Sequence, residues 1–379
     1  MKNKRFFQYA MVLFVMSCLT LKAQDLIDKG NRWEWKSDKE FVVKSGGKLQ
    51  MSDIHGDVSI CSWDQNKVGI HAVHAIQVLT KTEAEAVIQK YDVTYKQESN
   101  TVIVEGIEIG HQPVGSDYKI HIPKQFHCDI SMSAGDLEVE KIEGNIDAHV
   151  GGGDVKISGI LGPVTLDVGG GDIQIEFCQK DMDIHLGGGD LEIENAGGPI
   201  QIQMGGGDAT IEKCAGPVVL ELGGGDLEID QLEKDVQLQV GGGDVEITNI
   251  QGNAQCELGG GSIEIKDVAG SLSVKTGGGD IEALLTNAAT FKNPMHLETS
   301  IGEIDLTLPA SIKADILIEI QKIHDFSEEQ VYSDFPLKIS GNGDGMDGKI
   351  RATGTIHGGG PVIDLKTRGG DISINEEEI

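Results

Sequence analysis

The sequence predicts an all-β fold: a parallel β-solenoid with 18-residue coils, capped at both ends, with one short helix in the N-terminal cap. Three observations support this fold class. A Gly-Gly-Gly-Asp tetrapeptide recurs with a fixed step of 18 residues, apolar and polar residues alternate between its copies, and the flanking segments lack the period. A fixed repeat of this length indicates one supersecondary unit stacked on copies of itself.

The aspartates of the repeat form one arithmetic series. It consists of Asp136, Asp154, Asp172, Asp190, Asp208, Asp226, Asp244 and Asp280, with Ser262 in the one remaining place. Counted from the Asp as position 0, positions 1, 3 and 6 and most residues at positions 10, 12 and 14 are apolar. This pattern predicts two half-buried strands per coil. A coil of 18 residues leaves no room for a crossover helix, so coiling must make the strands parallel, with coils about 4.8 Å apart.

The glycines and the aspartate are predicted to form the corner of each coil. Glycine tolerates positive φ and has no Cβ to collide with the next coil, and an Asp side chain can accept hydrogen bonds from the amides of its own turn. The alternative interpretation is a calcium ladder, because calcium binds carboxylate oxygens. That ladder would use Asp154, Asp172, Asp190, Asp208, Asp226 and Asp244. Carboxylates about 5 Å apart repel by about 3 kcal/mol at an effective dielectric near 20, so the column requires water, protons, amide donors or cations.

The N-terminal segment predicts export. Residues 1–23 read as a signal peptide, with Lys2, Lys4 and Arg5 before an apolar run. Cys18 lies in an imperfect lipobox, which leaves a lipid anchor open as an alternative to simple cleavage. After removal of the signal, no segment is long and apolar enough to span a membrane.

The rest of the chain divides into three parts. Residues 24–128 are predicted to form a β-rich N-terminal cap with a helix that begins at a capping box of Thr80 and Glu83. Residues 129–281 form the regular solenoid, and residues 282–379 form irregular coils and the C-terminal cap. Solenoid ends carry unpaired backbone groups, so a cap is expected at each.

The charge restricts the class of partner. The formal net charge is −30, and removal of residues 1–23 takes away four cations and no acid, which leaves about −34. Nucleic-acid binding needs a basic surface and is excluded. The acids at positions 0, 2 and 4 point outward and are predicted to form an interaction surface for a basic partner. The residues assigned to it are Glu192, Glu194, Asp226, Glu228, Asp230 and Glu246.

The motifs of common enzymes are missing from the sequence, which predicts no catalytic residue and no cofactor apart from the calcium alternative. The glycine runs lack the Lys-Ser/Thr ending of a phosphate loop, and there is no Gly-x-Ser-x-Gly. Phe177 is the only aromatic residue between Asp129 and Thr290, which disfavours a sugar-binding groove along the rod. Trp33, Trp35 and Trp63 are interpreted as packing in the N-terminal cap.

Three motifs resemble those of a known family. They are the repeated Gly-Asp-(Ile/Leu/Val)-x-(Ile/Val), the stretch from Asp117 to Pro123, and the stretch from Gly302 to Pro309. Over nearly the whole mature chain, this pattern resembles the bacterial "putative adhesin" β-strand-repeat domains of unknown function. The resemblance implies an exported β-solenoid and supplies no catalytic residues.

These inferences combine into an expected function. The chain is expected to be an exported, non-enzymatic, acidic β-solenoid that acts as an adhesin-like or scaffold interaction surface in the periplasm or at the cell surface. The alternative is a structural repeat protein stiffened by calcium, which a calcium-dependent melting temperature would reveal. An enzyme acting on envelope glycans is the third and least favoured class, because no acid–base pair beside an aromatic residue is found.

Overall fold

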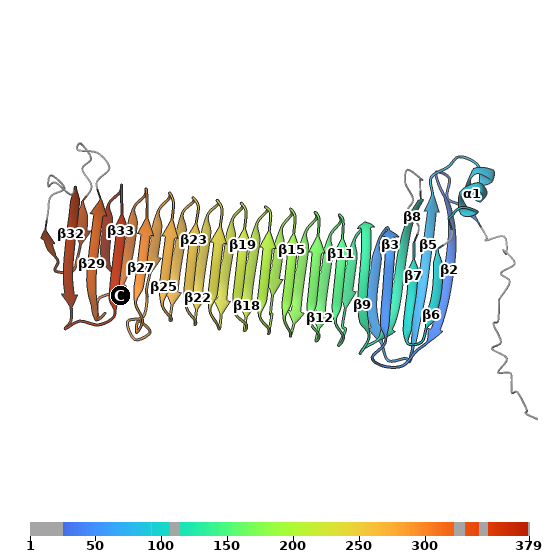
Figure 1. Cartoon of the computed structure of the whole chain (residues 1–379), viewed down its shortest axis with the longest axis horizontal. Coiled ribbons are helices and arrows are strands. Elements are labelled where there is room, and N and C mark those ends of the chain that lie inside the picture. The colour runs from blue at the N-terminus through green and yellow to red at the C-terminus, as the bar shows by residue number, and fades with distance from the viewer. Residues whose placement is uncertain (1–25, 92, 107–113, 322–329, 341–347, 378–379) are drawn as a thin grey trace, which may run out of the picture.

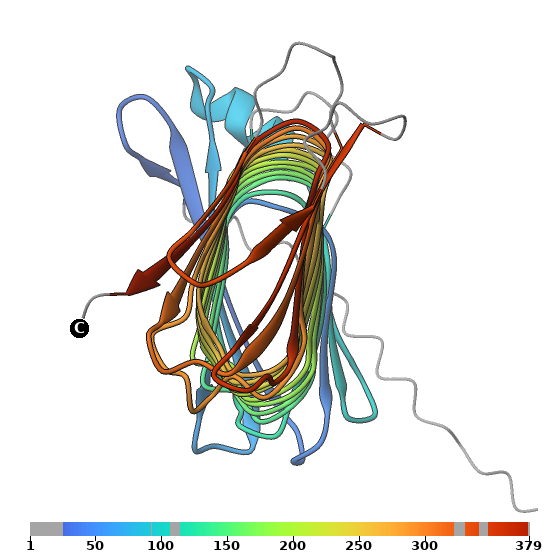
Figure 2. The same cartoon turned by 90° about the vertical axis from the view of Figure 1, so that its left-hand side faces the viewer.

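The protein is a long rod made of two sheets that pack face to face (Figures 1 and 2). The computed structural model describes residues 26–91, 93–106, 114–321, 330–340 and 348–377. The predicted signal peptide and Cys18 lie outside these residues. Each sheet has 17 strands, and the strand order of both is open. The predicted β-solenoid is therefore confirmed.

Each regular coil contributes one strand to each sheet. In the first sheet these strands are β10 (Leu137–Glu140), β12 (Val155–Ile160), β14 (Ile173–Cys178), β16 (Leu191–Glu194), β18 (Ala209–Cys214), β20 (Leu227–Leu232), β22 (Val245–Ile250) and β24 (Ile263–Val268), and β26 (Ile281–Leu284) after them opens a longer, irregular coil. In the second they are β11 (Ile146–Val150), β13 (Val164–Val168), β15 (Met182–Leu186), β17 (Ile200–Met204), β19 (Val218–Leu222), β21 (Val236–Val240), β23 (Ala254–Leu258) and β25 (Leu272–Thr276). All neighbours are parallel and one repeat apart, as in Val155 opposite Ile173 and Val164 opposite Met182.

The core is the space between the two sheets. It is filled by the predicted apolar columns, represented by Ile157 from the first sheet and Leu166 from the second, both fully buried. Burying a side chain of this size contributes about 1.5–3 kcal/mol relative to leaving it exposed. Cys128 and Cys256 pack in the same core as free thiols, and burial raises the pKa of each to about 12.

The three glycines of each corner differ in how much room they leave for a Cβ atom. A Cβ on Gly187 would overlap the carbonyl oxygen of Gly169, and one on Gly189 would overlap that of Gly171. Gly189 also has a φ of +126°, whereas a Cβ on Gly188 would meet nothing within 4 Å. The first and third glycines of each triplet are thus required by the close approach of neighbouring coils, and the middle one is not.

Position 5 of every regular coil has a left-handed backbone, which the sequence analysis did not predict. The non-glycine residues concerned are Lys141, Phe177, Asn195, Lys213, Gln231, Asn249 and Asp267, with φ between 53° and 59°. Positions 1 and 3 point inward, so simple alternation would also bury position 5. The left-handed residue breaks the alternation, exposes its own side chain and turns position 6 inward, as Phe177 and Cys178 show. This conformation costs about 1–2 kcal/mol for a non-glycine residue.

The N-terminal end departs from sequential stacking. Its elements are β1 (Ile27–Asp28), β2 (Trp33–Val42), β3 (Lys48–His55), β4 (Val58–Trp63), β5 (Lys67–Ile76), α1 (Lys81–Ile88), β6 (Thr94–Glu98), β7 (Thr101–Glu105), β8 (Val114–Pro123) and β9 (His127–Ala134). The coil of β3 and β4 pairs with β9 and β10 on one side and with β7 and β8 on the other. Antiparallel β5, β2 and β6 then close the end of the rod.

A small second core lies under α1. The helix begins at the predicted capping box of Thr80 and Glu83. It covers Trp35, whose ring stacks on the buried imidazole of His74 at 4.6 Å. His74 Nδ1 lies 2.8 Å from Ser116 Oγ, and burial lowers the pKa of His74 to about 4.

The C-terminal end is also threaded out of order. Its strands are β27 (Met295–Thr299), β28 (Ile304–Pro309), β29 (Ala314–Gln321), β30 (Val331–Ser333), β31 (Lys338–Ser340), β32 (Lys349–Ile356), β33 (Val362–Thr367) and β34 (Ile372–Glu377). The last coil, β33 and β34, lies between β27 and β29 in one sheet and between β28 and β30 in the other. Antiparallel β32 and β31 finish the second sheet.

Candidate functional site

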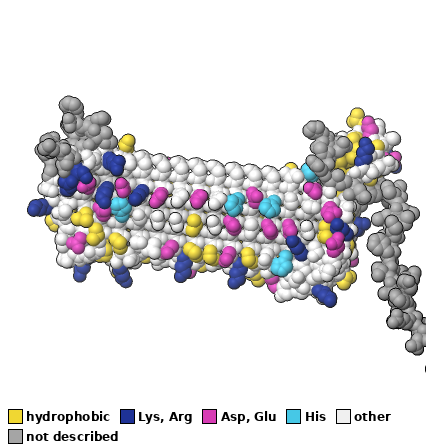
Figure 3. All heavy atoms as spheres, viewed as in Figure 1, with side chains coloured by type: hydrophobic (Ala, Val, Ile, Leu, Met, Phe, Trp, Pro, Cys, Tyr) yellow, Lys and Arg dark blue, Asp and Glu magenta, His cyan; other side chains and the backbone are white. Residues whose placement is uncertain are grey.

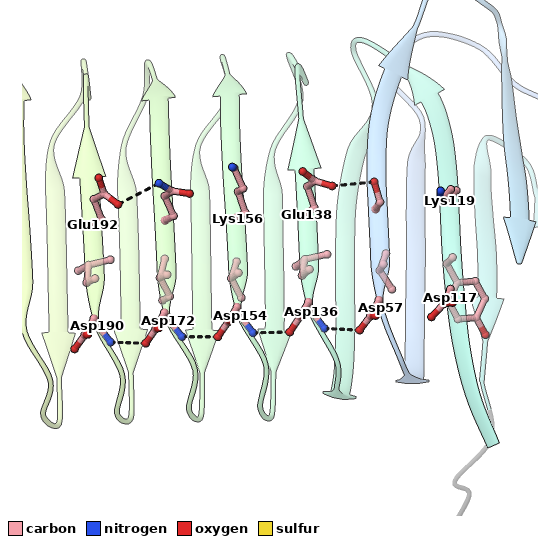
Figure 4. Close-up of a pocket in the computed structure, with 18 of the residues that line it drawn as sticks. Asp57, Asp117, Lys119, Asp136, Glu138, Asp154, Lys156, Asp172, Asp190 and Glu192 are labelled. Atoms are coloured by element: carbon pink, nitrogen blue, oxygen red, sulfur yellow. Dashed lines mark hydrogen bonds between the residues drawn. The ribbon is translucent and has the colours of Figure 1, made fainter. Parts of the chain in front are cut away.

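The aspartate column forms a hydrogen-bonded ladder that crosses the first sheet where its strands begin (Figure 4). The amide of Asp154 donates to Oδ1 of Asp136 at 2.9 Å, and the amide of Asp172 donates to Oδ1 of Asp154 at 3.0 Å. The same contact recurs up to Ser262, whose amide donates to Asp244 Oδ1 at 2.8 Å. The ladder is therefore continuous through the regular coils.

The ladder corrects the prediction that each Asp accepts from its own turn. The position 0 amide points along the rod axis toward the preceding coil, where a carbonyl would sit in an uninterrupted parallel ladder. The side-chain oxygen of the preceding Asp takes that place. The ladder also begins earlier than predicted, because the amide of Asp136 donates to Asp57 Oδ1 at 3.1 Å.

The sequence analysis gave water, protons, amide donors and cations as the means of relieving repulsion between the carboxylates of this column. The hydrogen bonds from backbone amides supply one of these four. Each carboxylate from Asp136 to Asp244 accepts an amide proton of the following coil, which stabilises its negative charge. Among the described residues, no three His, Cys, Asp or Glu side chains converge so that they could hold a metal ion. Calcium binding by the column stays a prediction.

The six residues assigned to the interaction surface lie on the outer face of the first sheet. Asp226 belongs to the ladder, Glu192, Glu228 and Glu246 lie at position 2, and Glu194 and Asp230 lie at position 4. These side chains are not equally available. Lys213 Nζ lies 2.7 Å from Glu194 Oε1, and this contact lowers the pKa of Glu194. Asp230 accepts from the side-chain amides of Gln231 and Asn249.

The strongest acidic feature is a row of four consecutive glutamates at position 2. Glu228 pairs with Glu246, Glu246 with Glu264, and Glu264 with Glu282 in neighbouring strands. None of them makes an ion pair with any other described residue. The sequence analysis did not assign Glu264 and Glu282 to the surface, although their shared position 2 in the repeat could have identified both. We call Glu228, Glu246, Glu264 and Glu282 the glutamate row.

Two shallow grooves follow the ladder along this face. The first has a volume of about 910 Å³ and runs from Asp117 to Thr210, with Lys119 and Lys156 in its lining. The second, of about 620 Å³, starts at Asp208 and ends at Glu282. The side chains that line the second groove include no Lys or Arg. The negative charge of the face is therefore most concentrated where the glutamate row lies.

The outer face of the second sheet is chemically different. Its side chains in the middle coils are mostly uncharged, namely Gln201, Gln203, Val219, Gln237, Gln239 and Gln255, with Glu221 and Glu257 among them. His149 approaches Asp167 at 3.3 Å and Asp147 at 3.7 Å. On the face of the rod that Figure 3 shows, acidic, histidine and lysine side chains are interspersed with uncharged ones. The second sheet thus offers an internal control for any effect of the acidic face.

The described part of the chain contains no helix that is long and apolar enough to cross a bilayer.

Comparison with known proteins identifies a family. The model of the Toastrack DUF4097 family matches residues 179–375, just over half of the chain. This match confirms the family resemblance predicted from the sequence motifs. No curated protein matches the chain.

Solved structures show low similarity to this chain. A "putative cell adhesion protein" from Clostridium sporogenes has 11% identity and a TM-score of 0.16, over 90% of this chain and 100% of that one. A "putative adhesin" from Bacteroides fragilis has 16% identity and a TM-score of 0.25, over 65% and 96%. A third, from Parabacteroides merdae, has 12% identity and a TM-score of 0.22, over 65% and 93%.

Proposed function

This chain belongs to the Toastrack DUF4097 family, and on that premise we propose that it is an exported, non-enzymatic, adhesin-like protein of the cell envelope. Its acidic first-sheet face binds a basic partner. The observation that carries the proposal is the glutamate row, which adjoins the aspartate ladder and has no cationic partner among the described residues.

The arrangement favours binding over catalysis. The sheet fixes the backbone positions of the glutamate row at the spacing of neighbouring parallel strands, about 4.8 Å, so four carboxylates are held within reach of one another before any partner arrives. A partner with several cationic groups gains from all of them at once, and like charges on a wrong partner are repelled. The thiols of Cys128 and Cys256, with pKa values raised to about 12, are protonated at neutral pH and are poor nucleophiles.

The test uses a fluorescent peptide of alternating lysine and glycine and the mature chain. Binding is measured by anisotropy at low and at physiological salt. The acidic-face variant carries Glu→Gln at all four positions of the glutamate row. The matched control carries Asp167→Asn, Asp183→Asn, Glu221→Gln and Glu257→Gln on the second sheet, so both variants lose four negative charges.

The two variants distinguish an effect of the acidic face on peptide affinity from an effect of the overall net charge. Binding weakens with salt, since exposed charges are screened beyond about 8–10 Å at physiological ionic strength. The acidic-face variant loses most of the affinity, and the second-sheet variant loses little. Equal losses in the two variants would show that only net charge matters and would remove the assignment to this face. Binding that is insensitive to salt would contradict an electrostatic surface altogether.

A further inference from the structure

A separate pocket lies at the N-terminal end of the first sheet, on its outer face. It has a volume of about 330 Å³ and is built by β2, β4, β5 and β8. The side chains used below are Asp38, Glu40, Trp63, His71, Lys119 and His121. This pocket differs from the grooves beside the ladder because the indole ring of Trp63 forms part of its wall.

Trp63 is held in this pocket by specific contacts. Its ring covers Gly69, where a Cβ would lie only 2.8 Å from the Cη2 atom of the indole. Its Nε1 donates to the carbonyl oxygen of Lys67 at 2.7 Å. The ring of His121 stacks on it at 5.1 Å with an interplanar angle of 25°. The prediction that Trp63 packs in the cap is therefore incomplete, because the indole lies on the outside of the sheet and borders a pocket.

Polar groups of both signs surround the indole. His71 Nδ1 lies 2.6 Å from Asp38 Oδ1. The strand register places Asp38, His71 and Lys119 side by side on three adjacent strands, and Glu40 opposite Gly69. Lys119 forms no ion pair with any described residue. The pocket thus offers carboxylate acceptors and ammonium and imidazole donors around one flat ring.

One cation already contacts the ring. Lys67 Nζ lies 5.3 Å from the centre of the Trp63 ring and 2.7 Å from Glu40 Oε1. This pair is exposed to solvent, and exposed ion pairs contribute only about 0–1 kcal/mol. The ammonium can therefore move off the ring face at little cost when a ligand covers it.

We propose that this pocket binds a neutral saccharide of one or two pyranose rings. The apolar C–H face of a pyranose stacks on the indole, and its hydroxyl groups donate to Asp38 and Glu40 and accept from Lys119 and His121. A charged ligand fits less well, because carboxylates and ammonium groups are both present. The volume of about 330 Å³ lies at the small end of the range for ligand pockets. The site shares Lys119 with the first groove but lies apart from the glutamate row, and it requires no basic partner.

The experiment titrates the mature chain with a panel of probes: methyl glucoside, methyl mannoside, cellobiose, maltose and chitobiose. Binding is followed by calorimetry and by saturation-transfer NMR, at a salt concentration that screens the acidic face. At least one probe is expected to bind in the millimolar range or tighter. Trp63→Ala is expected to weaken that binding by about tenfold.

Two further variants separate a stacking platform from a structural tryptophan. Gly69→Ala retains every polar group of the pocket but displaces the indole, and is expected to weaken binding similarly. Phe177→Ala removes another exposed aromatic side chain of the first sheet and is expected to leave saccharide binding unchanged. Binding of none of the probes would overturn the proposal. So would binding that Trp63→Ala leaves unchanged while the variant melts like the wild type.

Discussion

The hydrogen bond from the Asp208 amide to Oδ1 of Asp190 gives the most direct test of the aspartate ladder. The bond is 3.0 Å long and joins two coils. We compare Asp190→Asn with Asp190→Ala. Both variants remove the same charge, but only Asn retains an oxygen that can accept the amide proton. The difference between the two variants therefore isolates the hydrogen bond from the charge.

The magnitudes follow from the geometry. A neutral hydrogen bond contributes about 1 kcal/mol net, which corresponds to about fivefold faster exchange of the Asp208 amide in the Ala variant than in the Asn variant. The lost charge acts in the opposite direction. Asp190 has an aspartate on each side, and each repulsion amounts to about 1 kcal/mol for exposed groups in water. We therefore expect Asp190→Asn to be as stable as the wild type or more stable.

The assay is hydrogen–deuterium exchange of the Asp208 amide, resolved by NMR or by peptides that contain it. The amide of Asp244 is the control, because it makes the same contact with Asp226 at 2.9 Å two coils away. The reasoning is refuted if Asp208 exchanges at the same rate in both variants. It is also refuted if the Asp244 amide changes as much as that of Asp208, which would indicate general loosening of the rod.

Four further predictions follow. Because burial lowers the pKa of His74 from 6.5 to about 4, His74 takes up a proton at a higher pH in the unfolded chain than in the folded chain. The free energy of unfolding of the N-terminal cap therefore declines as the pH falls between those two values, and it should be about 2 kcal/mol lower at pH 5 than at pH 7. His74→Phe should flatten that part of a urea-unfolding pH profile. Gly188→Ala should leave the thermal melt nearly unchanged whereas Gly187→Ala lowers it clearly, and equal effects would contradict the corner geometry. Phe177→Asn should raise the free energy of unfolding in urea by up to about 1 kcal/mol, since Asn tolerates a left-handed backbone better than Phe. A lower free energy of unfolding would show that packing of the exposed Phe177 ring stabilises the fold. Calcium in place of EDTA should leave the melting temperature unchanged, with magnesium as control, if amide donors alone suffice for the ladder; a rise specific to calcium would restore the metal interpretation.

The acidic face was predictable to the extent that it follows the repeat. Six of its residues were assigned from position alone, and all six lie on one face of the first sheet. Their availability was not predictable, because it depends on neighbours one coil away. Glu194 is engaged by Lys213, and Asp230 by Asn249, each 19 residues further along the chain. The pocket at Trp63 could not be predicted at all, since it joins four strands whose pairing is not sequential.

The sequence by itself determined the regular part of this protein. A strict 18-residue period places every coil in the same environment, so the period sets the parallel stacking and the inward columns, and the row of aspartates follows from it. The tertiary structure alone decided what each aspartate oxygen binds, because that partner belongs to another coil. It also decided the left-handed turn at position 5, where Phe, Lys and Gln occur as well as Asn and Gly. Finally, it decided the threading at both ends, where coils from distant parts of the chain fill a place in the stack and cover edges that would otherwise leave backbone groups unpaired.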